Sequence, residues 1–404
     1  MRSSTDREPT YARFTAASRA AVAPFHVMDL LAAAAERRTS HGDVLDLVAG
    51  QPSTPAPQPV RAEAARVLES QVLGYTPAVG IPALREAIAA SYATRYGVDV
   101  DPAEVVVTTG SSGGFLLSFL GAFEVGDRVA MARPGYPCYR NVLSALGCEV
   151  VELPTDAATR FQPTVDAVAA AHAERPLAGL VVASPANPTG TMLTRAELAA
   201  LAAWCEEHGV RLVSDEIYHG IVHGRAEQGP WESCAWETSR TGLVLGSFSK
   251  YFSMTGWRIG WMLVPADLRR TVDVLAGNFT ICAPVLSQHA AVAGFSAEAT
   301  TELDAHVLRY RENRDLLLDG LPRLGIDRLA PADGAFYVYA DVDHLTEDSL
   351  AWCRRLLAET GVAITPGIDF DTVDGNHHVR FSCAGDTGEV REALERLSSW
   401  LPAP

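Results

Sequence analysis

The chain has 404 residues, of which 48% are hydrophobic and 20% charged, and its formal net charge is −16. This length allows two domains around a large core, and the composition is typical of a soluble globular protein. The negative charge argues against nucleic acid or an anionic membrane as a partner, and the longest uncharged stretches, 105–123 and 275–297, are too interrupted by polar residues to predict membrane spans.

The cysteine and histidine content narrows the class of protein further. The seven cysteines are odd in number and form no CxxC pair, which favours free thiols in a reducing cytoplasm over a disulfide framework. The 11 histidines include no HExxH pattern and no cluster with cysteine, so no metal site is predicted. The N-terminus shows no apolar secretion segment, and a cytoplasmic protein is expected.

The first hundred residues predict helices separated by proline-rich loops. Residues 1–10 are polar and are expected to fray. An alanine-rich stretch predicts a helix over 17–38, and a proline-rich loop follows at 50–57. Two further helices are predicted over 59–70 and 83–96. Pro82 suits the first helical position of the second one, where its missing N–H is no loss.

The middle of the chain alternates short apolar runs with helical patterns. Strands are predicted at 104–108, 128–132, 179–183, 211–214 and 242–245, and helices at 113–123, 139–146 and 195–208. This alternation predicts an α/β fold whose mostly parallel sheet carries helices on both faces. The apolar run 259–264 follows so closely that we expect it to pair antiparallel.

The pattern changes after residue 284. A long helix is predicted over 286–321, with later helices over 349–360 and 388–401 and strands at 336–340, 362–365 and 379–382. These elements predict a smaller α+β domain. We therefore expect a large domain at 51–284 and a small domain at 285–404, with residues 1–50 forming an N-terminal arm and part of the small domain.

Lys250 is the only lysine of the chain, so the other 32 of its 33 basic Lys and Arg residues are arginines (33 − 1 = 32). An arginine guanidinium keeps its proton in proteins and cannot form an imine. A lysine amine can lose its proton when its surroundings lower its pKa, and it then attacks carbonyl carbon. One lysine among arginines could also be chance, and the residues around Lys250 decide between the two readings.

Polar clusters follow the predicted parallel strands, where α/β sheets bind ligands. Residues 110–113 open a helix whose free N–H groups favour an anion, and Ser247, Ser249 and Arg258 add donors suited to phosphate. Asp215 leaves an apolar strand, and a buried carboxylate needs a cationic partner. Phosphate, cation and an aldehyde for the Lys250 amine together describe pyridoxal 5′-phosphate (PLP).

Each of these features has an ordinary structural interpretation when taken alone. A Gly-Ser-Ser-Gly loop is usually a helix start, an Asp after a strand is usually a helix cap, and Asn-Pro is usually a turn. Tyr75 and Tyr136 could be packing aromatics. The prediction depends on the order in which the motifs occur together.

The motifs resemble those of the class I/II aminotransferases, the fold-type-I PLP enzymes. The resemblance covers about residues 47–401, and its most specific part runs from Ser247-Phe248-Ser249-Lys250 through Gly256-Trp257-Arg258-Ile259-Gly260. Asn187-Pro188-Thr189-Gly190 and Ser214-Asp215-Glu216-Ile217-Tyr218 match two more family motifs in the right order.

The resemblance implies a role for each matching residue. Lys250 would hold PLP covalently as an aldimine and act as the catalytic base, and Asp215 would pair with the ring nitrogen. Asn187 and Tyr218 would bond the ring's 3-hydroxyl oxygen, and Tyr136 would stack on the ring. The phosphate would be held by Ser111, Ser112, Ser247, Ser249 and Arg258, and by Tyr75 of the neighbouring subunit in a homodimer. Arg380 would bind the substrate carboxylate, and Gly50 would line the substrate pocket.

Three functions are then compared. The first is transfer of an amino group from an amino acid to a 2-oxo acid by a ping-pong aldimine/ketimine mechanism, in amino acid metabolism and biosynthesis. The second is a PLP-dependent lyase or oxidase acting on an amino acid, because the same first carbanion serves all these reactions. The third is a non-catalytic PLP-binding regulator, which the resemblance disfavours because such regulators carry a basic DNA-binding domain ahead of this region.

The amino donor and the oxo-acid acceptor are not readable from the sequence. Arg380 accounts for one carboxylate of the substrate. Arg133 and Arg140 lie near Tyr136 in the sequence, but nothing in the pattern shows whether either faces the pocket. A neutral or aromatic amino donor is favoured over a dicarboxylate.

Overall fold

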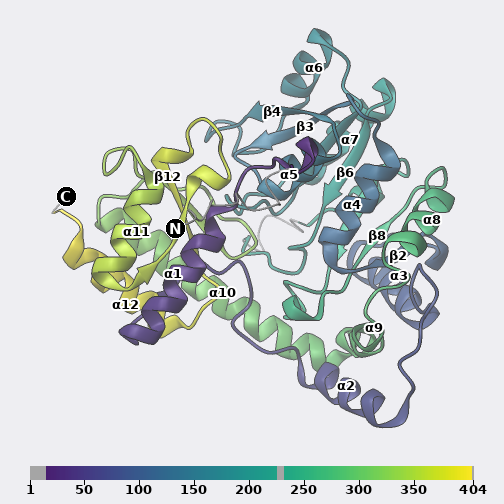
Figure 1. Cartoon of the computed structure of the whole chain (residues 1–404), viewed down its shortest axis with the longest axis horizontal. Helices are drawn as coiled ribbons and strands as arrows, with labels where there is room; N and C mark the ends of the chain where they lie inside the picture. Colours follow the sequence, from purple (N-terminus) through teal and green to yellow (C-terminus); the bar gives the residue numbers. More distant parts are fainter. Residues whose placement is uncertain (1–14, 225–231, 403–404) are drawn as a thin grey trace, which may run out of the picture.

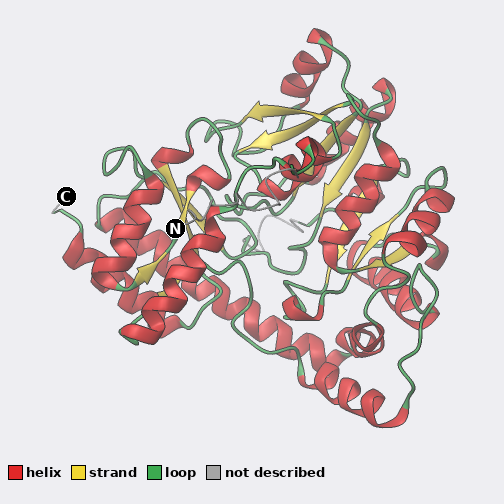
Figure 2. Cartoon of the chain, in the orientation of Figure 1, coloured by secondary structure: helices red, strands yellow, loops and turns green. Residues whose placement is uncertain are grey.

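A seven-stranded sheet forms the centre of the larger part of the molecule (Figures 1 and 2). The structure is a computed structural model that describes residues 15–224 and 232–402, so the predicted polar stretch 1–10 lies outside the described residues. In spatial order the strands are β2 (Val105–Thr108), β8 (Gly260–Leu263), β7 (Leu243–Ser247), β6 (Arg211–Asp215), β5 (Gly179–Ala183), β3 (Arg128–Arg133) and β4 (Glu149–Pro154).

All neighbouring strands of this sheet are parallel except β8, which runs antiparallel to both β2 and β7. The predicted α/β class with a mostly parallel sheet is confirmed, and so is the antiparallel pairing of 259–264. Strand β4 was not predicted. It lies at the sheet edge, pairs only with β3 and carries charged Glu149 and Glu152, so it lacks the continuous apolar run of a buried strand.

Helices cover both faces of the sheet (Figure 2). The helices of the described chain are α1 (His26–Ser40), α2 (Gln58–Ser70), α3 (Pro82–Tyr96), α4 (Gly110–Ala122), α5 (Pro137–Ala145), α6 (Val165–Glu174), α7 (Arg195–His208), α8 (Arg269–Phe279), α9 (Val285–Val292), α10 (Ala297–Arg323), α11 (Ser349–Thr360) and α12 (Thr387–Trp400). Within the described residues, none of them is both long enough and apolar enough to cross a bilayer.

Alternate residues of each strand belong to the two layers of the core. Val106 of β2 packs in the cluster shared with α4, α5 and α8. Its neighbours Val105 and Val107 pack in the cluster shared with α3, α6 and α7. This alternation follows from the two-residue period of a strand. Burial on both faces fixes the sheet rigidly, and its carboxyl-terminal edge is the platform on which the pocket described below is built.

Two smaller sheets lie in the other part of the molecule. One is antiparallel, with order β11 (Thr365–Pro366), β12 (His378–Ser382) and β9 (Tyr337–Asp341). The other pairs β1 (Leu45–Asp46) in parallel with β10 (Val362–Ala363). The segment that follows α1 is therefore joined to the C-terminal region, and α1 lies beside α11 (Figure 1).

Two helix predictions are wrong in their bounds. The predicted helix 286–321 is divided into α9 and α10, because Ser296 adopts an extended conformation and its hydroxyl accepts the Ala299 N–H at 3.2 Å, which starts a new helix. The helix predicted over 17–38 begins only at His26. Pro24 disfavours helical backbone in the residue before it.

Candidate active site

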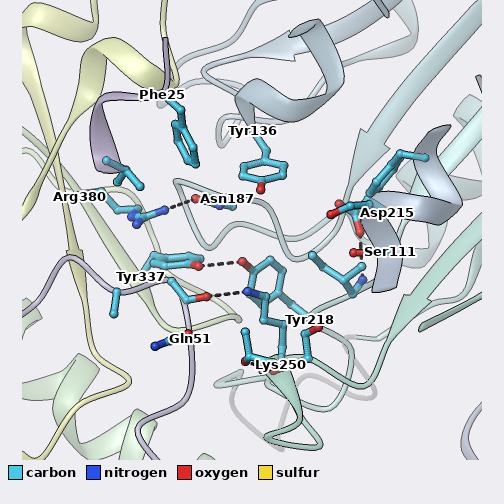
Figure 3. A pocket seen from close by; sticks show the side chains of 18 of the residues that line it. Phe25, Gln51, Ser111, Tyr136, Asn187, Asp215, Tyr218, Lys250, Tyr337 and Arg380 are labelled. Atoms are coloured by element: carbon cyan, nitrogen blue, oxygen red, sulfur yellow. Dashed lines mark hydrogen bonds between the residues drawn. The ribbon is translucent and has the colours of Figure 1, made fainter. Parts of the chain in front are cut away.

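A cavity of about 300 Å³ is lined by residues from the strand ends of the large sheet and from the smaller part of the chain. It brings together eleven of the thirteen predicted site residues: Gly50, Ser111, Ser112, Tyr136, Asn187, Asp215, Tyr218, Ser249, Lys250, Arg258 and Arg380. Figure 3 shows that the labelled side chains among them converge from both parts of the chain on one space. Residues from several different strand ends meet here, as expected at the open edge of an α/β sheet.

The Lys250 amine lies in the centre of this pocket. Its Nζ donates to the Gly50 carbonyl at 2.5 Å and lies 5.6 Å from the centre of the Tyr218 ring. Burial, together with the nearby Arg380 and Arg258 guanidinium groups, lowers the pKa of Lys250 to about 8. The neutral, nucleophilic amine is therefore far more accessible near neutral pH than that of an ordinary lysine.

The Asp215 carboxylate is 2% exposed at the end of β6. It accepts the Ile217 N–H at 3.1 Å and the Tyr139 hydroxyl, and it has no ion-pair partner among the described residues. Burial raises the pKa of Asp215 to about 6, against the lowering effect of these two hydrogen bonds. Such a carboxylate is suited to a cationic ligand group that would replace the lost water.

The start of α4 forms an anion-binding corner. Gly110 turns the chain with a φ of +65°, and a Cβ there would lie 2.5 Å from an Arg258 guanidinium nitrogen. Arg258 itself has a φ of +51° and its Nη1 donates to the Thr255 carbonyl at 3.0 Å. Non-glycine residues rarely adopt this left-handed conformation, so the surrounding structure must hold the Arg258 backbone in it. In this conformation the guanidinium lies against the start of α4, where the helix N–H groups are free.

The Arg380 guanidinium is buried, with 3% exposure, and its hydrogen-bond partners among the described residues are neutral. It donates to the Asn187 side-chain oxygen at 2.7 Å, the Val48 carbonyl at 2.9 Å and the Thr365 hydroxyl at 3.2 Å. Its Nε has no hydrogen-bond partner in the described part of the chain. The centres of the Tyr337 and Phe370 rings lie 4.2 and 4.8 Å from the guanidinium carbon. A buried cation without a counter-ion is suited to bind a carboxylate.

Tyr218 lies beside Lys250, and Asn187 lies beside Arg380 (Figure 3). The Tyr218 hydroxyl shares a hydrogen bond of 2.7 Å with the Tyr337 hydroxyl. The Tyr136 ring lies edge-on to the Phe25 ring, with centroids 6.3 Å apart. These side chains leave a slot between aromatic surfaces, with polar groups at its rim.

Two predicted site residues do not line the cavity. Ser247 is buried, and its hydroxyl accepts the Ser249 N–H at 3.0 Å, so it shapes the turn that carries Lys250. Tyr75 is 84% exposed in the loop before α3.

The two arginines that the sequence left open, Arg133 and Arg140, do not line the pocket either. Arg133 pairs with Asp371 at 3.2 Å, and Arg140 pairs with Glu152 at 2.9 Å.

Sequence reasoning missed several lining residues. Tyr139 follows Tyr136 by one helical turn, and that spacing could have placed both on one face of α5. Tyr337 and Phe25 offered no signal, because each reaches the pocket through contacts between segments far apart in the sequence. Phe25, Val27 and Leu31 form an apolar wall at the start of α1, which we call the α1 wall.

Comparisons with known proteins agree with this geometry. A family model described as aminotransferase class I and II matches residues 42–397. The valine–pyruvate aminotransferase of Mycobacterium tuberculosis is 63% identical over 387 residues, covering 96% of this chain and 98% of its own length. A crystal structure of an aminotransferase from the same organism has a TM-score of 0.94 at 62% identity, covering 97% of this chain and all of the other. Aspartate aminotransferase from Thermus thermophilus, solved with maleate, has a TM-score of 0.89 at 33% identity and covers 96% of this chain and all of its own.

Proposed function

The chain belongs to the class I and II aminotransferases, which depend on PLP, and on that premise we propose that it moves the amino group of a neutral, apolar amino acid to a small 2-oxo acid. The observation that carries this proposal is one pocket that holds three ionisable groups with no ion-pair partner among the described residues. These are the sole lysine amine, the Asp215 carboxylate and the Arg380 guanidinium.

The pocket residues fit the cofactor that the family uses. Asp215 lacks a cationic partner among the described residues, which a protonated ring nitrogen would provide. Ser111 and Ser112 in the first turn of α4 would hold the phosphate together with Arg258 and Ser249. Ser247 would contribute indirectly, because its hydroxyl shapes the turn that carries Ser249. Asn187 and Tyr218 would hold the ring's hydroxyl oxygen, and Tyr136 would stack on the ring.

When bound, the cofactor supplies an aldehyde carbon and a ring that accepts electrons. The protein's own residues then orient the substrate and move its proton. Arg380 binds the substrate carboxylate bidentately, with Gly50 at the pocket floor. The Lys250 amine would take the proton from the substrate Cα and deliver it to the carbon of the former aldehyde, because its lowered pKa leaves it a competent base near neutral pH. Asp215 would hold the ring nitrogen in its charged form.

The residues that line the rest of the pocket support an amino-acid donor with a neutral side chain. The cationic lining residues are Lys250, Arg258 and Arg380, and each has a place in the scheme above. No further cation among the described lining residues would meet a second substrate carboxylate. The α1 wall is apolar instead, and the relative from Mycobacterium tuberculosis carries a name that pairs valine with pyruvate.

We further propose a cytoplasmic homodimer with a role in amino acid biosynthesis, in which Tyr75 of each subunit reaches the phosphate in the neighbouring one. All seven cysteines are free, which suits a reducing compartment. The exposure of Tyr75, together with Val72 at 97%, supports a second copy covering this loop. We also propose the division into a large domain at 51–284 and a small domain at 285–404, with 1–50 as an arm and part of the small domain.

The decisive experiment mixes the cofactor-loaded protein with single amino acids. Transamination predicts conversion of the cofactor to its pyridoxamine form with one equivalent of 2-oxo acid. Release of ammonia without that conversion would indicate a lyase or oxidase. Lys250→Ala should reduce turnover by about a thousandfold or more while keeping part of the affinity for the cofactor phosphate. Turnover at the wild-type rate in this variant would remove Lys250 as the base.

Borohydride reduction of the loaded protein provides an independent check. The label should map to the peptide that contains Lys250 and to no other ε-amine, because the chain has only one.

A further inference from the structure

The α1 wall begins at a helix end that has no cap of its own. The N-cap residue of α1 is Phe25, and its side chain makes no capping hydrogen bond. The first N–H groups of a helix have no partner within the helix and must find one elsewhere. Here they are bound by a carboxylate from the opposite end of the chain: His26 N–H donates to Asp369 Oδ1 at 2.9 Å and Val27 N–H donates to Asp369 Oδ2 at 2.8 Å.

Asp369 is 3% exposed, and its neighbour Phe370 is fully buried. The backbone of Asp369 and Phe370 also contacts the part of the pocket that belongs to the large sheet. The Asp369 carbonyl accepts from Arg140 Nη2 at 3.1 Å, and the Phe370 carbonyl accepts the Gly135 N–H at 2.9 Å, next to Tyr136. The Phe370 ring lies 4.8 Å from the Arg380 guanidinium. Two consecutive residues thus meet the α1 wall, the carboxylate-binding arginine and the segment that carries Tyr136.

We propose that Asp369 is a positioning residue for side-chain recognition: by holding the first turn of α1, it places the α1 wall at a fixed distance from Arg380 and so sets the size of the apolar donor that the pocket accepts. This inference rests on the proposed function. The rest of α1 is held independently of Asp369. Its Arg37 bonds Asp43 and the Ala358 carbonyl, and Ala34 packs with Leu357. Val27 belongs to the same apolar cluster, so the two Asp369 hydrogen bonds orient the first turn rather than attach it. Loss of Asp369 therefore loosens the first turn and leaves the helix in place.

The test compares Asp369→Ala, which removes both acceptors, with Asp369→Asn, which keeps one. Asp386→Ala is the matched control, because Asp386 caps α12 by accepting the Gly388 N–H at 2.8 Å and does not line the pocket. All three are assayed as cofactor-loaded enzyme with L-valine and L-alanine. We expect the KM for valine to rise about tenfold in Asp369→Ala, because the loss of one apolar contact in a pocket usually changes affinity by about this factor. The rise should be smaller in Asp369→Asn. The KM for alanine and both kcat values should stay within about threefold of wild type.

Amide hydrogen exchange gives a readout that does not depend on activity. In Asp369→Ala the amides of residues 26–28 should exchange about tenfold faster or more, while those of 34–40 stay protected. The Asp386→Ala control should change neither the valine-to-alanine ratio nor the α1 amides. An unchanged valine-to-alanine ratio in Asp369→Ala would overturn the inference, whether or not the first turn exchanges faster. A wild-type enzyme that transaminates neither substrate, or does not prefer valine, would instead overturn the proposed donor. If Asp369→Ala does not fold, the same comparison is made with Asp369→Asn.

Discussion

Two ionisable side chains in the pocket titrate far from their usual range, and the cause in both is burial. The pKa of Lys250 is lowered to about 8 and that of Asp215 is raised to about 6. In each case the surroundings disfavour the charged form. The protein therefore carries an energetic cost at the two residues to which we assign the chemistry, which is common at functional sites.

Replacing Lys250 by methionine should stabilise the cofactor-free protein. Methionine has a similar length and no charge to bury, so we expect the free energy of unfolding at pH 7 to rise by about 1–2 kcal/mol, with turnover lost. The folded pKa of about 8 lies below the unfolded value of 10.5. Between these values the unfolded chain binds more protons, so wild-type stability rises with pH. Urea unfolding at pH 7 and pH 9.5 should show the advantage of the variant shrinking at the higher pH.

Tyr139→Phe should weaken cofactor binding through Asp215. The Tyr139 hydroxyl donates to the carboxylate and lowers its pKa, so its removal raises that pKa above about 6. A carboxylate holds a cationic ring nitrogen only while it is ionised, and affinity is lost as pH falls through its pKa. We expect affinity to be about tenfold lower at pH 6, with the loss on acidification starting at a higher pH than in wild type.

Cofactor titrations between pH 5 and 8 provide the measurement for Tyr139→Phe. Tyr92→Phe is the control. It removes a buried hydroxyl that accepts the Trp261 Nε1 hydrogen at 3.0 Å and that does not line the pocket. Equal titration curves for Tyr139→Phe and wild type would mean that Asp215 does not hold the ring nitrogen.

At the scale of elements, the pocket depends on how closely β8 approaches the start of α4. A Cβ on Gly260 would lie 2.9 Å from the Gly110 carbonyl carbon, the Gly246 carbonyl oxygen and the Ser111 nitrogen. These are backbone atoms, which cannot move aside as a flexible side chain can. The absence of a side chain at Gly260 thus lets the anion-binding end of α4 lie directly over the strand that follows the Lys250 turn.

Gly260→Ala should therefore move α4 away from Arg258. We expect a loss of stability of about 1–3 kcal/mol from overpacking and an affinity for inorganic phosphate or cofactor that is lower by about tenfold. Gly256→Ala is a matched control in the same segment, because a Cβ there would meet no atom within 4 Å. Thermal unfolding with and without cofactor separates the two effects. A Gly260→Ala protein with wild-type affinity would show that α4 does not need this approach.

Local signals decided which elements the sequence could predict. Helix α7 was predicted with its correct bounds, because Thr194 and Glu197 form a capping box and Gly209 ends the helix in a left-handed conformation. Helix α11 likewise ends at Gly361. The break at Ser296 was missed because apolar spacing continues through it. Strand β4 was missed because Glu149 and Glu152 interrupt its apolar run. Helices α6 and α8 were also missed, although each carries buried apolar residues.

The site was predicted to the extent that its residues lie in motifs that are contiguous in the chain. Asp215 and Lys250 follow strands whose ends meet, so their convergence could be inferred. Phe25, Tyr337 and Asp369 could not be found this way. Tyr337 approaches Arg380 through the pairing of β9 with β12, and Asp369 meets α1 across 342 residues of sequence. Such contacts depend on tertiary packing, which produces no periodic pattern in the amino-acid sequence.

At the scale of the whole molecule, an apolar surface near Tyr75 is left uncovered in the single chain. Val72 is 97% exposed and Tyr75 is 84% exposed. Helix α8 meets the same loop, since a Cβ on Gly277 would lie 3.7 Å from the Ala78 side chain, and Phe279 at the end of α8 and Ile281 beyond it are also exposed. Large exposed apolar side chains in one region usually mark an interface. A second copy of the chain is the occupant that we propose, and it would give a particle of twice 43.2 kDa.

Subunit complementation tests whether Tyr75 acts across that interface. Lys250→Ala and Tyr75→Ala are each expected to be impaired as homodimers. In a mixed dimer, one site would combine an intact Lys250 with the intact Tyr75 of the other subunit. That dimer should regain about half of the wild-type turnover, since one of two sites is restored. If Tyr75 served its own subunit, mixing would restore nothing. Sedimentation of the mixed sample confirms that dimers are present.

A protein with one ε-amine behaves unusually toward acylating reagents. Coupling chemistries that immobilise or label most proteins at random would find only the Lys250 nitrogen, which lies inside the pocket, and the α-amine. A cofactor bound to the Lys250 nitrogen should therefore protect it from an ester dye, while the cofactor-free protein should gain one added group at this residue. The chain thus contains a built-in reporter of whether the pocket is filled, readable by mass at the Lys250 peptide, with no engineered tag.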